Sequence, residues 1–308
     1  MTKMENQNEH EHKEHFQKEH WYNKHYKTLL FIPVALLILS LIYLVNFEKK
    51  EGDIIRKDVT LTGGTTIAVF DKNADIQKIK SSLVNDFPDI AIRGLSDFRT
   101  GEQNGLILET KQPINLIKPA LEKYLGYYLN QDNSSIEFSS QSVSQGFYKQ
   151  LRYAILIAFI FMAIVISLIF RNFVPSIAVI FAAFADIVMT LTVVNLIGLT
   201  LSLAGVVAFL LLIGYSVDTD ILLTNRVLKK REGTTNNKIF GAFKTGMTMT
   251  LTSITAVGVS LLVVYNYSDV LRQMFIILLI GLFFDIVNTW LTNASIIKWY
   301  VDKKERSR

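Results

Sequence analysis

Residues 151–197 read LRYAILIAFIFMAIVISLIFRNFVPSIAVIFAAFADIVMTLTVVNLI, and this stretch decides the fold. It holds two apolar runs, 151–170 and 174–197, which are separated by a short polar segment around Arg171. A helix needs about 20 predominantly apolar residues to cross a bilayer, and each run is long enough. The stretch therefore predicts two consecutive transmembrane helices.

Further apolar runs of similar length lie on both sides of this pair. A cleaved signal peptide has a shorter apolar region that ends in small residues, so the first run is interpreted as a membrane anchor. We predict six transmembrane helices, of which the last five form a membrane domain over residues 151–298. The four remaining runs are 29–47, 200–224, 246–266 and 272–297.

The orientation of these helices is predicted from the basic residues between them. Loops on the cytoplasmic side carry an excess of Lys and Arg. Six spans with the N-terminus inside place the tails, 1–28 and 299–308, and every basic loop in the cytoplasm, with residues 48–150 outside the cell membrane. The basic residues that decide this are Arg171, Arg226, Lys229, Lys230, Arg231, Lys238, Lys244, Lys298, Lys303, Lys304, Arg306 and Arg308.

The external segment, 48–150, has the composition of an ordinary soluble domain. Alternating apolar residues indicate strands, and apolar residues at helical spacing indicate helices. Their order is β-α-β-β-α-β, which is the ferredoxin-like arrangement. The predicted elements are a strand at Thr65–Phe70, a helix at Ala74–Asn85, strands at Ile90–Phe98 and Leu106–Glu109, a helix that opens at Pro113, and a strand at Ser135–Val143.

Acidic residues inside the predicted spans are the strongest functional signal. They are Asp186, Asp218, Asp220 and Asp285, and no Lys or Arg lies at a matching depth. A charged group at the bilayer centre costs at least about 3 kcal/mol. Two interpretations stay open: neutral acids that hold helices together by hydrogen bonds, or a proton relay, because burial favours the neutral acid until water or a cation arrives.

The pair Asp218 and Asp220 is limited by helix geometry, because residues two apart point about 200° apart. One of them faces the conducting centre and the other faces a neighbouring helix or a partner protein. We favour Asp218 as the proton carrier and Asp220 as an assembly residue, since Gly214, one turn before Asp218, leaves room for water. Four residues are predicted to extend a polar lining, namely Thr219, Thr252, Asn288 and Asn293.

Other kinds of chemistry are not indicated. The chain of 308 residues has no cysteine, no P-loop and no nucleophile elbow, so we expect neither an enzyme nor a bound cofactor. The net charge of +5 comes with no basic patch interleaved with aromatics, so nucleic acid is not an expected partner. Five histidines lie within 1–28. They could form a metal site, or the segment could be a solvated tail or a short surface helix without bound metal. We favour the interpretation without a metal.

Three motifs resemble the SecF family of protein-export membrane proteins. Thr62-Gly63-Gly64-Thr65 looks like the family signature at the start of the external domain. GYSVDTD at 214–220, followed by Asn225-Arg226, looks like the fourth-helix motif, and DIVNTW at 285–290 looks like the archaeal branch. This chain departs from the bacterial motif in two places. The bacterial acid falls where this chain has Thr219, and the arginine that the family has in its fifth helix is absent here, with Thr248 near its position. The likeness covers about residues 29–300.

The resemblance implies a member of the resistance-nodulation-division superfamily. It implies that the chain pairs with SecD and acts with the Sec translocon of SecY and SecE on unfolded exported polypeptides. It also implies contact with membrane lipid and the use of the proton gradient as the energy source. Six spans make half of the usual unit, whose sites lie at the interface between repeats. The alternatives are a structural subunit without proton coupling and half of a small-molecule exporter of the same superfamily.

Overall fold

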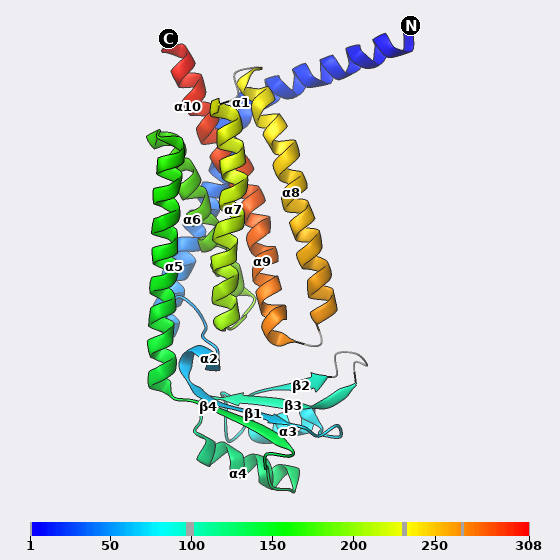
Figure 1. Ribbon diagram of the computed structural model, residues 1–308, viewed down its shortest axis with the longest axis vertical. Coiled ribbons are helices and arrows are strands. Elements are labelled where there is room, and N and C mark those ends of the chain that lie inside the picture. Colours follow the sequence, from blue (N-terminus) through cyan, green and yellow to red (C-terminus); the bar gives the residue numbers. More distant parts are fainter. Residues whose placement is uncertain (1, 97–101, 230–232, 266–267, 308) are drawn as a thin grey trace.

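The computed structural model describes residues 2–96, 102–229, 233–265 and 268–307. Long helices form a bundle, and a small domain of strands and helices lies at one end of it (Figure 1). Both chain termini lie at the opposite end of the bundle. The molecule is therefore divided as the hydropathy pattern predicts.

The described residues contain six helices that are long and apolar enough to cross a membrane, which confirms the predicted membrane fold. The last of them begins as an α-helix, passes through a π-helical turn and continues as an α-helix. The bounds are α1 Thr2–Glu51, α5 Gln141–Phe170, α6 Phe173–Leu196, α7 Leu203–Lys229, α8 Thr235–Val264, α9 Asp269–Val287, η1 Asn288–Asn293 and α10 Ala294–Arg306.

The centre of the bundle is formed by α6 and α7, which bury more of their surface than the other helices. Outer helices expose large apolar side chains, such as Phe161 and Leu168 on α5 and Leu262 on α8. Such side chains are stable in contact with lipid tails rather than water. The exposed apolar surface of the bundle is thus the surface of a membrane protein.

The helix ends differ from the predicted spans in several places, and the last span also continues to Arg306 instead of ending at residue 297. The segment 1–28, predicted as a tail, is helical and continuous with the first span, because α1 runs from Thr2 to Glu51. The last strand does not reach Val143: Ser140 caps α5, its hydroxyl accepting from the Val143 N–H at 3.4 Å. The fifth span begins earlier than predicted, at Thr235, and residue 266 lies outside the described residues.

The external domain has the predicted β-α-β-β-α-β order. Its strands form one antiparallel sheet in the order β2-β3-β1-β4, and its two main helices cover one face of that sheet (Figure 1). The predicted strand 90–98 begins at Ala91, and its last two residues lie outside the described residues. The elements are β1 Gly64–Val69, α3 Ile76–Leu83, β2 Ala91–Ser96, β3 Gln103–Thr110, α4 Ile114–Leu125 and β4 Ser134–Ser139.

The domain has a hydrophobic core of its own between the sheet and the helices. Ile67 of β1 and Leu108 of β3 are fully buried against Ile117 and Leu121 of α4. At a stabilisation of about 25 cal/mol for each Å² of apolar surface buried, a few such side chains contribute several kcal/mol. Because the domain has its own core, each strand and helix buries one face, and its apolar residues recur with the spacing of that element.

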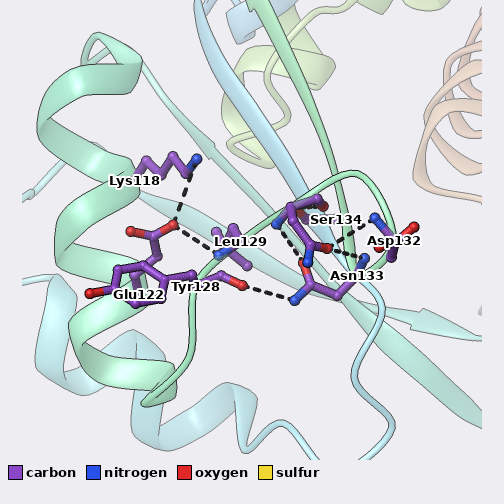
Figure 2. A network of polar contacts seen from close by, with 8 residues as sticks. Lys118, Glu122, Tyr128, Leu129, Asp132, Asn133 and Ser134 are labelled. Carbon is purple, nitrogen blue, oxygen red and sulfur yellow. Dashed lines mark hydrogen bonds and ion pairs between the residues drawn. The ribbon is translucent and has the colours of Figure 1, made fainter.

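A hydrogen-bonded turn joins α4 to the edge strand β4 (Figure 2). The Glu122 carboxylate accepts from the Leu129 N–H at 2.8 Å, and the Asn133 side chain donates to the Tyr128 carbonyl at 2.9 Å. Lys118 lies 3.7 Å from Glu122 as an ion pair one helical turn away. These contacts fix where β4 begins beside β1.

A short pairing of main chains fixes the external domain to the bundle. The Leu201 N–H, in the loop between α6 and α7, donates to the Arg56 carbonyl at 2.6 Å, and the Asp58 N–H donates back to the Leu201 carbonyl at 3.0 Å. Asn195 at the end of α6 also donates to the Ile54 carbonyl at 2.7 Å. The linker after α1 is therefore bound where α6 ends and α7 begins, next to this domain.

The glycines of the Thr62-Gly63-Gly64-Thr65 motif have a structural role. Gly63 ends the short helix α2 (Val59–Thr62) with φ of 84°, and Gly64 opens β1 with φ of 150°. A Cβ at Gly64 would lie 2.2 Å from the Thr110 carbonyl oxygen of β3. Only glycine fits a position that combines positive φ with so close an approach of main chains.

Gly64→Ala is therefore expected to destabilise the external domain by at least about 2 kcal/mol, because strain and the clash with Thr110 act together. Gly126→Ala is the matched control: its φ is 81°, but a Cβ there would meet no atom within 4 Å, so strain alone costs about 1 kcal/mol. Hydrogen exchange of the β1 and β3 amides in the detergent-solubilised chain measures both. Equal loss of protection in the two variants would contradict this assignment.

Candidate functional site

Three buried carboxyl groups from three helices meet in the middle of the bundle. Asp186 of α6 and Asp220 of α7 have no exposed surface, and Asp285 of α9 is 1% exposed. Isolated ionised carboxylates are too costly to bury in hydrocarbon, so groups in this position are neutral or hydrogen-bonded. The site is called the acid cluster below and consists of these three residues.

Small residues let the three helices approach one another at this level. A Cβ on Gly281 of α9 would lie 2.5 Å from the Leu212 side chain of α7. On α6, the residues around Asp186 include the fully or almost fully buried alanines Ala182, Ala183 and Ala185. Close approach of helices through small residues is the usual packing mode in membranes, and it brings the carboxyl groups near each other.

Asp186 is hydrogen-bonded on both of its carboxylate oxygens. The Ser216 hydroxyl of α7 donates to Oδ2 at 2.5 Å, and the Asn288 amide donates to Oδ1 at 2.7 Å. Two donors satisfy an acceptor-only carboxylate. Both oxygens of Asp186 therefore have a hydrogen-bond donor.

Asp220 and Asp285 have a different environment. The Asn293 amide donates to Asp220 Oδ1 at 2.7 Å, and the Thr289 hydroxyl donates to Asp285 Oδ1 at 3.2 Å. The second oxygen, Oδ2, of each acid is buried and has no hydrogen-bond partner among the described residues. A bare buried oxygen is costly as part of an anion, so each of these acids suits the protonated form.

The π-helical turn η1 supplies the donors. A π-helical turn contains more residues than an α-helical one, and it often marks a functional site. The turn keeps Asn288, Thr289, Thr292 and Asn293 fully buried, with Asn288 directed to α6 and Asn293 to α7. The sequence predicted both Asn288 and Asn293 as polar lining, but it did not indicate the π-helix or that Asn293 donates to Asp220.

No cation neutralises the acid cluster within the described part of the chain. The basic residue nearest in the motif, Arg226, donates instead to the Gly241 carbonyl and to the Thr245 hydroxyl of α8. Lys298, although 3% exposed, is paired with Asp302 at 3.3 Å. The charge state of the cluster is therefore set by hydrogen bonds and by protons.

The other predicted residues lie outside the cluster. Asp218 is exposed on the outer face of α7, and the described residues offer it no hydrogen bond or ion pair. Thr219 is buried and packs toward Gly246 of α8, where a Cβ would lie 3.2 Å from its methyl group. Thr252 is exposed, and its hydroxyl donates to the Thr248 carbonyl at 2.7 Å.

The structure places the two acids of the α7 motif in different surroundings, and the role of each stays a prediction. Asp220, which we expected at the helix interface, lies in the acid cluster. Asp218, which we expected at the conducting centre, faces away from it. Residue spacing predicted that the two would face different ways, but the direction of each depends on which side of α7 is covered by α6 and α9.

Comparisons with known proteins agree with this architecture. The family described as protein export membrane protein SecD/SecF, C-terminal, matches residues 121–303. The protein-export membrane protein SecF of Methanocaldococcus jannaschii is 38% identical over 90% of this chain and 96% of its own length. SecF of Methanolacinia petrolearia is 37% identical over 90% of this chain and 94% of its own length.

A solved structure has the same fold. The crystal structure of SecDF, a translocon-associated membrane protein from Thermus, superposes with a TM-score of 0.69 at 15% identity. The match covers 91% of this chain but only 38% of that longer one. Together with the matches to the archaeal proteins along nearly their whole length, this shows that the chain belongs to the SecF family of protein-export membrane proteins.

Proposed function

We propose that the chain is the SecF-type half of a SecD–SecF complex, which uses the proton gradient to assist translocation of unfolded polypeptides through the SecY/SecE channel. The observation that carries the proposal is the acid cluster. Three carboxyl groups are buried in the membrane domain without a cation among the described residues. Membrane-buried acids are costly and typically lie on ion or proton pathways.

The uneven hydrogen bonding supports protons as the coupling ion. Asp186 already accepts two hydrogen bonds, whereas Asp220 and Asp285 each keep one bare oxygen. We infer that Asp220 and Asp285 take up and release protons, and that Asp186 is held in place by Ser216 and Asn288. A change of charge on α7 and α9 alters how strongly these helices hold α6, which links protonation to helix movement.

The partner half is proposed to cover the exposed face of α7. Val207, Leu211, Tyr215 and Asp218 lie along this face, and all are exposed. A carboxyl group facing lipid costs about 3 kcal/mol, so a neighbouring helix that hydrogen-bonds Asp218 would be stabilising. The Thermus SecDF chain, of which this chain spans 38%, suggests the kind of partner: a second membrane half of SecD type.

The hydroxyls of α8 suit the same role of a packing surface. Thr248, Thr252 and Thr255 are exposed, and each donates to the carbonyl four residues earlier at 2.7 to 2.8 Å. Because these hydroxyls are satisfied within the helix, the face can contact either lipid or another helix without an unpaired donor. We therefore place Thr252 on the outer surface rather than in a proton path.

A structural role for the acids is the second candidate, and one observation favours it. The bonds from Ser216 and Asn288 to Asp186, and from Asn293 to Asp220, cross-link three helices. An export assay in inverted membrane vesicles separates the candidates. We expect the chain to increase export only while the gradient exists, so an uncoupler should remove the whole increase. An increase that survives the uncoupler would favour the structural role.

Both termini are proposed to be cytoplasmic and the external domain extracytoplasmic. Gln131, in the turn before β4, and Asn237, in the first turn of α8, are exposed and lie at opposite ends of the bundle (Figure 1). The chain has no native cysteine, so single cysteines can be introduced at either position. A membrane-impermeant maleimide should label Gln131→Cys from outside intact cells and Asn237→Cys only after lysis. Labelling of both from one side would contradict this topology.

A further inference from the structure

A cavity of about 690 Å³ lies at the end of the bundle that carries both termini, between α1, the start of α8 and α10. Figure 1 shows these three elements converging there. Tyr26 and Lys27 of α1, Thr235 of α8, and Lys298 and Arg306 of α10 line it. Nothing in the acid cluster takes part in this cavity, so it needs a separate explanation.

The residues around the cavity have the composition of a membrane interface. Aromatic residues that are half apolar and half polar collect at the membrane interface, and Tyr26, Trp299 and Tyr300 lie at this level of α1 and α10. One turn further along α1, Phe31 is 73% exposed and Ile32 is 52% exposed, as expected for residues in contact with lipid tails. A lipid lying against α1 would therefore present its headgroup to the cavity.

One wall of the cavity is a fixed, buried cation. Lys298 is 3% exposed, its ammonium lies 3.3 Å from the Asp302 carboxylate, and it stands 5.5 Å from the centre of the Tyr26 ring. Asp302 balances most of the charge of Lys298. The ammonium retains donors for a further oxygen ligand, and its position is set by α1 and α10 together.

Two further cations are not balanced in this way. Lys27 and Arg306 are exposed at the cavity, and the described part of the chain contains no ion pair for either. Helix α8 begins at the same place, with Thr234 as its cap accepting from the Asn237 N–H at 3.3 Å. The N-terminal end of a helix attracts anions, which adds to the attraction of the two side chains.

We propose that this cavity binds the headgroup of an anionic phospholipid, with the phosphate between Lys27, Lys298 and Arg306. The hydroxyls of Thr234 and Thr235 and the carboxylate of Glu305, which also line the cavity, suit the hydroxyl groups of a glycerol headgroup. Basic pockets between membrane helices on the cytoplasmic side are typical sites for anionic lipids. The volume is within the range of ordinary ligand pockets. The bound lipid would join α1, α8 and α10 at their inner ends.

The test is a thermal-unfolding titration of the full chain in neutral detergent with phosphatidylglycerol. The melting temperature is expected to rise saturably, because a ligand that binds the folded chain stabilises it. In the double variant Lys27→Gln/Arg306→Gln the apparent affinity should fall about 30-fold, since each basic residue near a lipid surface contributes about fivefold. The control double variant Lys303→Gln/Lys304→Gln removes two neighbouring charges of α10 that do not line the cavity, and its affinity should stay within about threefold of the original.

If the double variant does not fold, Lys27→Gln alone provides a second measurement. Its apparent affinity for phosphatidylglycerol should fall about fivefold. Phosphatidylcholine and inorganic phosphate are titrated in parallel. A saturable rise with phosphate alone would overturn the assignment to a lipid, and an equal rise with phosphatidylcholine would overturn the requirement for an anionic headgroup. Equal loss in the two double variants, or no loss in the first, would overturn the site.

Discussion

Asp220→Asn is expected to abolish the gradient-dependent increase in export while leaving the complex assembled. Asparagine has nearly the same shape and can still accept from the Asn293 amide, which lies 2.7 Å from Asp220 Oδ1. It cannot take up or release a proton. If the bare oxygen of Asp220 is a site of protonation, losing it removes the coupled step rather than reducing it slightly, because a relay with one missing member does not conduct.

The measurement is export into inverted vesicles with and without an uncoupler. Asp218→Asn is the matched control, because it makes the same chemical change two residues away on the opposite side of α7. It should retain most of the gradient-dependent increase. Normal export by Asp220→Asn and failure of Asp218→Asn would restore the assignment that the sequence favoured. If neither change matters but the two together break the complex, the acids are structural.

Asp218→Leu is expected to weaken association with a SecD-type partner by about tenfold or more. Asp218 is exposed on the outer face of α7 without a partner in the described chain, and a hydrogen bond to a carboxyl group contributes about 1.5 to 3 kcal/mol. Leucine also removes the cost of the polar group in lipid. The isolated chain should therefore be no less stable, so that the loss falls on association alone.

Co-purification in mild detergent at several protein concentrations measures this loss. Val207→Ala, on the same exposed face but without a polar group, is the control and should change the affinity little. Undiminished association of Asp218→Leu would mean that this face of α7 contacts lipid and that the partner binds elsewhere.

Much of the fold was predictable because the helical bundle is surrounded by lipid and the small domain by water, and each solvent requires a different sequence pattern. In the membrane, long uncharged runs are required for spanning, so the six helices could be recognised without any knowledge of their packing. In the external domain, the alternation of Thr65–Phe70 and the helical spacing after Ala74 follow from burial on one face only. Helix ends were less predictable, since the cap at Ser140 depends on local hydrogen bonds that apolar patterns do not reveal.

The site was predictable as a set of residue types but not as an arrangement. Acids in apolar runs are unusual enough to be noticed singly, and Asp186, Asp220 and Asp285 were all identified. Which side of α7 faces α6 and α9 depends on long-range packing, so the sequence could not show which of Asp218 and Asp220 is buried against those helices. The π-helical turn that directs Asn288 and Asn293 to different acids leaves no simple periodicity in the sequence.

The central claim is that protons bind within the acid cluster, and infrared spectroscopy tests it directly. A protonated carboxyl group has a C=O stretching band that a carboxylate lacks, so the band can be followed in reconstituted chain through a series of pH steps. The account predicts that Asp220→Asn and Asp285→Asn each remove part of the band that changes with pH, and that Asp218→Asn in the assembled complex leaves that part in place. A pH-dependent carboxyl band that persists unchanged in both Asp220→Asn and Asp285→Asn would contradict it.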